Sequence, residues 1–159
     1  MRFATGVLVA LTFGPSVGAA QECTPWQFTS DGGYNGETPE ASTRCEGFGT
    51  FVMLCYDSAF LIGFTPAQEP AESGFPDGYA AISYTFPEQV YSDVATYYDA
   101  TGVFALLRHV WDGRHPFIEA FQANAEVGVS MPTLGVDGFI SLDGSRAAIE
   151  QVIAACPGN

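Results

Sequence analysis

The chain contains no lysine, and it has few positively charged residues of any kind. Its five basic residues are all arginine, against eighteen acidic residues, which gives a formal net charge of −13 over 159 residues. Binding to nucleic acid or to an anionic lipid surface depends on clustered Lys and Arg, so the sequence excludes nucleic acid as an expected partner and argues against such lipids. The acidic residues are dispersed, which is typical of a solvated surface.

Long hydrophobic runs are also missing after the first twenty residues. A membrane-spanning helix needs roughly 18 consecutive apolar residues, and no later segment reaches that length. The N-terminal segment 1–20 instead has the layout of a secretory signal peptide, with Arg2 before the apolar run 7–13 and small residues at 17–20. We predict cleavage after Ala20.

The predicted mature chain, residues 21–159, has the length of a single domain. The residues that precede Cys23 are Ala-Gln-Glu and do not form a lipobox, so we expect no lipid anchor. The sequence therefore predicts a periplasmic or secreted protein with no membrane span.

The four cysteines show neither a C-x-x-C motif nor the ligand spacing of a zinc site. In an oxidising compartment they are expected to form disulfides, for which four cysteines allow three pairings. We favour Cys23–Cys45, which would pin a polar loop, and Cys55–Cys156, which would tie the C-terminal helix to the sheet.

Motifs for catalysis are absent as well. The chain has no G-x-S-x-G elbow, and its acidic residues do not single out a catalytic pair. The only histidines are His109 and His115, which with Asp112 are the candidate ligands of a metal site. The alternative, which we favour, is a turn at Asp112-Gly113 with both histidines in ordinary contacts. We therefore expect no cofactor, and the sequence favours a non-catalytic protein over an enzyme.

Hydrophobic patterning predicts a mainly β structure. Segment 21–47 is interpreted as a loop with a short strand at 25–29, and segment 88–102 fits either strand or loop. Segment 103–111 is apolar enough to be buried on both faces. Strands are expected at 49–56, 59–64, 79–86, 103–111, 126–131 and 136–142.

Two helices are predicted near the C-terminus. Pro116 suits the first position of the first helix, and Ser145 is a natural N-cap for a second helix over 146–156. In that second helix Ile149, Val152 and Cys156 fall on one apolar stripe. The expected fold is α+β: a mainly antiparallel sheet, sandwich-like or curved, with one or two short helices, stapled by disulfides.

Tyrosine tolerates a wet edge, so the tyrosines are the aromatic residues most suited to a binding face. The candidates are Tyr34, Tyr56, Tyr79, Tyr91, Tyr97 and Tyr98. No particular binding site is predicted among them.

The hairpin around Cys55 and the strand–Gly–Ser–helix–Cys ending resemble those of small exported proteins of Gram-negative bacteria. The two similar groups are the accessory proteins of type VI secretion clusters (the VasI/TagO group) and the invasion-associated locus B proteins. The resemblance covers about a third of the mature chain and implies a periplasmic, non-enzymatic role in the envelope or in secretion. It rests on Cys55, Phe139, Leu142, Gly144, Ala148, Ile149 and Cys156.

Two functions are therefore expected. The first is an exported interaction or assembly protein that docks to an envelope protein and has no active site. The alternative is a small metal-binding or ligand-binding protein, or a hydrolase, with a site around His109, Asp112 and His115.

Overall fold

The computed structural model describes residues 21–33, 36, 38–56, 59–68, 78–98, 101–108 and 115–156. These residues form nine strands and two α-helices, with a 3₁₀ turn at Pro132–Leu134. The strands are β1 (Gln27–Thr29), β2 (Glu40–Cys45), β3 (Gly49–Tyr56), β4 (Ala59–Pro66), β5 (Tyr79–Phe86), β6 (Gln89–Tyr98), β7 (Val103–Arg108), β8 (Glu126–Met131) and β9 (Val136–Ser141). The helices are α1 (Pro116–Ala123) and α2 (Ser145–Ala155).

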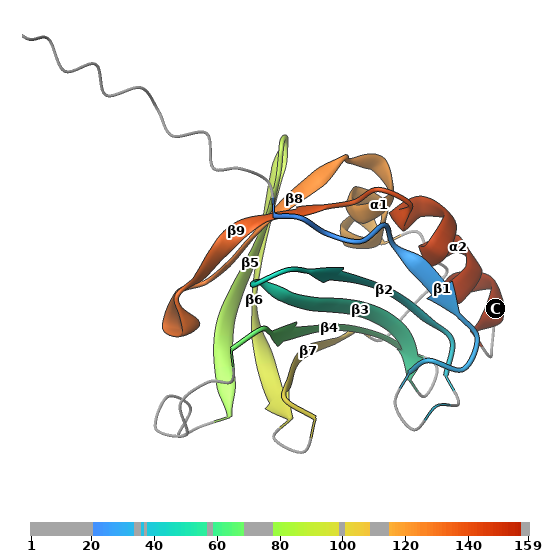
Figure 1. Ribbon diagram of the computed structural model, residues 1–159, viewed down its shortest axis with the longest axis horizontal. Coiled ribbons are helices and arrows are strands. Elements are labelled where there is room, and N and C mark those ends of the chain that lie inside the picture. The colour runs from blue at the N-terminus through green and yellow to red at the C-terminus, as the bar shows by residue number, and fades with distance from the viewer. Residues whose placement is uncertain are drawn as a thin grey trace, which may run out of the picture.

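All nine strands belong to one antiparallel sheet in the order β1-β2-β3-β4-β7-β6-β5-β8-β9. The sheet is strongly curved, so that β5 and β6 cross behind β2, β3 and β4 (Figure 1). This confirms the expected antiparallel α+β fold with helices near the C-terminus and identifies it as a curved sheet.

The segment 21–26 joins the two ends of the sheet. On one side the Thr24 N–H donates to the Arg44 carbonyl of β2 at 2.9 Å. On the other side the indole Nε1–H of Trp26 donates to the Ser141 carbonyl of β9 at 3.0 Å. Figure 1 shows this segment running between β9 and β2 before it enters β1. The curved sheet therefore closes on itself through residues that precede its first strand.

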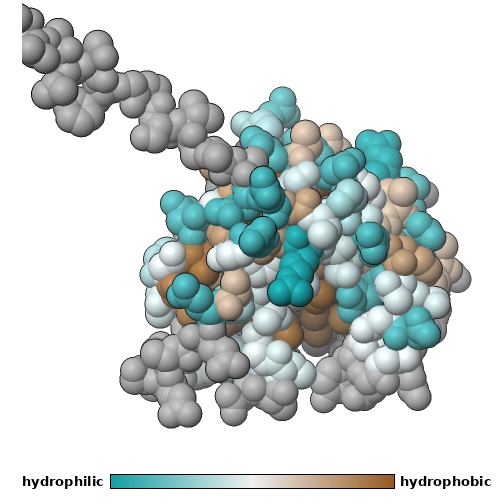
Figure 2. Space-filling view, in the orientation of Figure 1, coloured by the Kyte–Doolittle hydropathy of each residue, from teal (hydrophilic) through white to brown (hydrophobic). Residues whose placement is uncertain are grey.

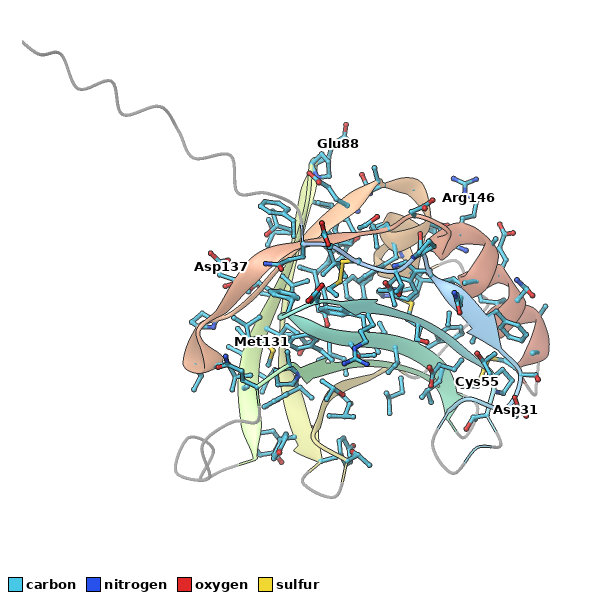
Figure 3. All side chains as sticks on the ribbon, in the orientation of Figure 1. Asp31, Cys55, Glu88, Met131, Asp137 and Arg146 are labelled. Carbon is cyan, nitrogen blue, oxygen red and sulfur yellow. A yellow bond between two sulfur atoms is a disulfide. The ribbon has the colours of Figure 1, made fainter. Side chains whose placement is uncertain are left out.

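The core lies inside the curve of the sheet and is rich in aromatic rings. Phe51 of β3 stacks on Phe64 of β4 with ring centroids 4.4 Å apart, and Phe117 and Phe121 of α1 pack edge to face. Both helices lie at the same end of the molecule, and α2 contacts β1, β2 and β3. Charged side chains such as Glu88, Asp137 and Arg146 point away from this core (Figure 3).

Both favoured disulfides are confirmed, Cys23–Cys45 and Cys55–Cys156. The first joins segment 21–26 to the end of β2, and the second joins the end of α2 to β3. Within the described residues, no helix has the length and apolar character that crossing a membrane requires.

Two sequence expectations are corrected. Residues 40–45 form β2, although segment 21–47 was expected to be a loop; its inward side chains, Ala41 and Thr43, are small and give little hydrophobic contrast. Gly144, with φ +78°, is the N-cap of α2. Ser145 is instead the first helical residue, and its buried hydroxyl donates to the Phe121 carbonyl at 2.7 Å.

The undecided segment 88–102 contains β6. The expectation that segment 103–111 is buried on both faces holds only in part for the residues described. Phe104 and Leu106 enter the core, but Val103 on the opposite face of β7 is half-exposed.

Candidate functional site

The outward side of the sheet carries apolar side chains where a solvated antiparallel sheet would carry polar ones. We define the outer apolar face as Val52 and Leu54 of β3, Leu61 of β4, Tyr79 of β5, Val94 and Tyr98 of β6, and Val103 and Ala105 of β7. Figure 2 shows hydrophobic side chains over β3 and β4, bordered by hydrophilic ones.

Strand register makes this face continuous. Leu54 pairs with Leu61, and Tyr98 of β6 pairs with Val103 of β7. A second row crosses five strands. Val52 pairs with Gly63, and Gly63 pairs with Ala105. Ala105 pairs with Thr96, which pairs with Tyr79. Directly opposite residues in adjacent strands bring their side chains within contact distance. The face therefore extends from β3 across β4, β7 and β6 to β5.

Exposure differs across the outer apolar face. Tyr79, Val94 and Tyr98 on the β5–β6 hairpin are 58%, 57% and 45% exposed. Toward β3 the side chains are more enclosed, and Leu54 and Ala105 are 5% and 4% exposed. Neighbouring exposed apolar residues, such as Tyr79, Val94 and Tyr98 on this hairpin, mark interaction surfaces more often than ordinary solvated surface.

The centre of the face is shaped by Gly63. A Cβ atom at this position would lie 2.8 Å from Val52 Cγ2 and 2.9 Å from Val103 Cγ1. Two methyl groups from neighbouring strands therefore converge over the Gly63 backbone, and only a residue without a side chain fits beneath them. This packing holds the two valines in place, so the centre of the face is preformed.

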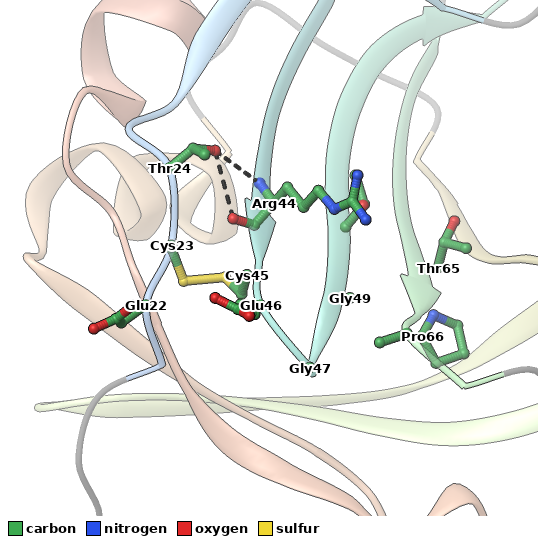
Figure 4. Close-up of a pocket in the computed structure, with 12 residues that line it drawn as sticks. Glu22, Cys23, Thr24, Arg44, Cys45, Glu46, Gly47, Gly49, Thr65 and Pro66 are labelled. Atoms are coloured by element: carbon green, nitrogen blue, oxygen red, sulfur yellow. Dashed lines mark hydrogen bonds between the residues drawn. A yellow bond between two sulfur atoms is a disulfide. The ribbon is translucent and has the colours of Figure 1, made fainter.

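An open cleft of about 810 Å³ lies at one end of the outer apolar face, between segment 22–24, the β2–β3 turn and the end of β4. Figure 4 shows the Arg44 side chain reaching across β3, whereas Glu22 and Glu46 point in the opposite direction. Thr50 and Thr65 lie in the same row as Arg44. The cleft therefore presents a guanidinium and two hydroxyl-bearing residues beside an apolar surface.

A second group of polar residues lies beneath α1. Tyr91 and Asp93 of β6 and His115 line a cavity of about 50 Å³. His115 is the N-cap of α1, and its Nδ1 accepts a hydrogen bond from the Phe117 N–H at 3.3 Å. A cavity of this size admits water but not a small-molecule substrate.

The candidate metal residues are only partly described. His115 has the helix-capping role, while His109 and Asp112 lie outside the described residues. Among the residues whose positions the structure gives, no three His, Cys, Asp or Glu side chains gather as a metal site would require. The described part of the chain therefore offers no donor set for a metal.

The four candidate tyrosines whose side chains the structure describes divide between the two sides of the sheet. Tyr79 and Tyr98 belong to the outer apolar face. Tyr91 and Tyr97 pack against the core, while the side chains of Tyr34 and Tyr56 lie outside the described part of the chain. The sequence analysis did not identify the aliphatic part of the outer apolar face. The signal for it in the sequence is that β3, β4 and β7 do not alternate apolar with polar residues, which indicates apolar side chains on both sides of these strands.

The Tyr91 hydroxyl yields a pH-dependent prediction. Burial raises the pKa of Tyr91, and the Glu119 carboxylate raises this pKa further. The unfolded chain loses this proton near the ordinary pKa of about 10, before the folded protein does. The stability that neutral Tyr91 contributes is therefore complete below pH 10 and is lost as the pH rises through the folded-state pKa.

We expect Tyr91→Phe to reduce the loss of stability above about pH 10. The variant keeps the ring that contacts Phe117, with centroids 4.8 Å apart. Denaturant unfolding from pH 8 to pH 11 measures the effect, with Tyr79→Phe on an exposed tyrosine as the control. Equal alkaline slopes for wild type and Tyr91→Phe would contradict the prediction.

Comparison with family models, with curated proteins and with solved structures finds no match to this chain.

Proposed function

We propose that this is an exported, non-catalytic interaction protein of the periplasm or the extracellular space, which docks a protein of the cell envelope against its outer apolar face. The predicted signal peptide supports export, and the two disulfides suit an oxidising compartment. The resemblance to type VI secretion accessory proteins and to invasion-associated locus B proteins supports a role in the envelope or in secretion.

One observation carries the proposal: Tyr79, Val94 and Tyr98 are roughly half exposed, and they adjoin a preformed apolar centre. Burying such a surface against a partner gains about 25 cal/mol per Å² of apolar area. Aromatic anchors such as tyrosine are enriched at the energetic centres of protein interfaces. Exposed tyrosine and valine side chains therefore contribute free energy of binding at an interaction surface, whereas on a solvated surface they contribute none.

A photo-crosslinking amino acid placed at position 94 tests this function in living cells. We expect a discrete protein adduct from position 94 and none from position 90. Val90 is the matched control because it lies on the same side of β6, is 62% exposed, and is four residues from Val94. Equal labelling from both positions, or no adduct from position 94, would contradict the proposal.

Val94→Glu is the complementary variant. Because position 94 is now mutated, the crosslinking amino acid is placed at position 98 instead, on the same face. A carboxylate placed in an apolar interface loses its hydration, so we expect the yield of the protein adduct from position 98 to fall at least about tenfold. Val90→Glu adds the same charge outside the outer apolar face and is expected to leave capture unchanged. Thermal unfolding of both variants checks that they remain folded.

A further inference from the structure

A strip of polar side chains on β2 borders the outer apolar face. Its residues Glu40, Ser42 and Arg44 share the outward side of β2, because alternate residues of a strand point the same way. Ser42 pairs with Val52, and Glu40 pairs with Leu54. The β2 strip is therefore in register with the apolar residues of β3.

The two ends of the β2 strip carry opposite charges. Arg44 and Glu40 are four residues apart, which corresponds to about 14 Å along a strand. Arg44 is exposed and Glu40 is half-buried. Within the part of the chain that the structure describes, neither the guanidinium nor the carboxylate has an ion pair or a side-chain hydrogen bond. Both charges are therefore available to a partner.

We propose that the β3 side of the outer apolar face receives an extended polypeptide segment of the partner. This segment has an acidic and a basic side chain four residues apart on the same side. An apolar side chain lies between them. The acidic group lies at Arg44, the apolar group at Val52, and the basic group at Glu40. This inference rests on the proposed docking function and specifies the chemistry of the partner.

Charge and spacing select this occupant. An extended chain repeats its side chains every two residues, which is also the repeat of the β2 strip. A second copy of this protein does not fit as well, because two chains that each carry a net charge of −13 repel one another. Exposed charge pairs contribute orientation and register more than affinity. The opposite signs at the two ends therefore set the direction in which the segment lies.

Three synthetic nine-residue peptides test the inference by NMR titration of the full-length mature protein at low ionic strength. All three have valine at alternate positions, so that the valines share one side of the extended peptide. In the dipolar probe, Asp and Lys replace two of these valines that are four residues apart. The other two probes have Asp at both of these positions or Lys at both. We expect wild type to bind the dipolar probe about fivefold more tightly than either other probe, with shifts at β2 and β3.

Charge reversal predicts a change of preference. Arg44→Glu is expected to favour the two-Lys probe, and Glu40→Arg the two-Asp probe. The double variant Glu40→Arg/Arg44→Glu is expected to favour the dipolar probe again, bound in the opposite direction. This recovery distinguishes local charge recognition from damage to the fold.

Matched variants on α2 separate local charge from net charge. Arg146→Glu and Glu150→Arg make the same changes in net charge at exposed positions outside the β2 strip. Both are expected to rank the three probes by affinity in the same order as wild type.

The inference is overturned if no probe gives saturable shifts with wild type, or if all variants rank the probes in the same order of affinity. The proposed function is tested separately, because it is contradicted if the crosslinker at position 94 gives no protein adduct or labels no more than position 90 does.

Discussion

Removal of the Cys55–Cys156 disulfide is expected to lower the free energy of unfolding by about 4 to 5 kcal/mol in the variant Cys55→Ala/Cys156→Ala. The two cysteines are 101 residues apart, so the cross-link restricts most of the unfolded chain. The folded state changes less, because Ile149 and Val152 of α2 stay buried against the sheet. Denaturation with guanidinium chloride under non-reducing conditions measures the loss.

The Cys23–Cys45 disulfide provides the internal comparison. It joins residues separated by 22 positions, and the chain-entropy relation gives about 3 kcal/mol for a loop of this size. We therefore expect Cys23→Ala/Cys45→Ala to cost less stability than removal of the other bridge. A larger loss from Cys23→Ala/Cys45→Ala would show that closing the sheet through segment 21–26 contributes more than restriction of the unfolded chain.

Trp26→Ala is expected to lower the free energy of unfolding by about 3 to 5 kcal/mol. The indole is 5% exposed and packs edge to face on Phe121, with ring centroids 6.3 Å apart. The backbone N–H of Trp26 donates to the Asp143 carbonyl at 2.8 Å, and its Nε1–H donates to Ser141. The side chain thus fills the core where the sheet closes, and its removal leaves a cavity there.

Trp26→Phe separates packing from hydrogen bonding. The phenyl ring retains most of the apolar contact but has no donor for the Ser141 carbonyl, so we expect a loss of about 1 kcal/mol. Both variants are measured by urea unfolding, with far-UV circular dichroism to confirm folding. Equal losses for Trp26→Phe and Trp26→Ala would contradict the assignment of most of the effect to packing.

Elements with strong local patterns were predicted closely. The hairpin is found as β3 and β4, and the expected strands 79–86 and 126–131 have the same bounds as β5 and β8. The apolar stripe of the last helix correctly placed Cys156 for its disulfide with Cys55. These elements depend on residue periodicity and on β-branched or aromatic content, which are local properties.

Strand β2 shows where local patterns fail. Its inward residues Ala41, Thr43 and Cys45 alternate with polar residues, but only tertiary packing makes them core residues. Its pairing with β3 and with segment 21–26 stabilises a sequence that has little strand preference of its own. The sequence therefore did not show that Arg44 lies on the outward side of a strand beside the outer apolar face.

Residue types and spacings along the chain were enough to predict the antiparallel α+β class with one or two helices near the C-terminus, and to favour the two disulfide pairings that the structure shows. Tertiary structure decided which side of β3, β4 and β7 enters the core and which side forms the outer apolar face. In strands that are apolar on both sides, periodicity does not distinguish the faces. That choice depends on the curvature of the sheet and on where the helices pack, and both arise only when distant strands meet.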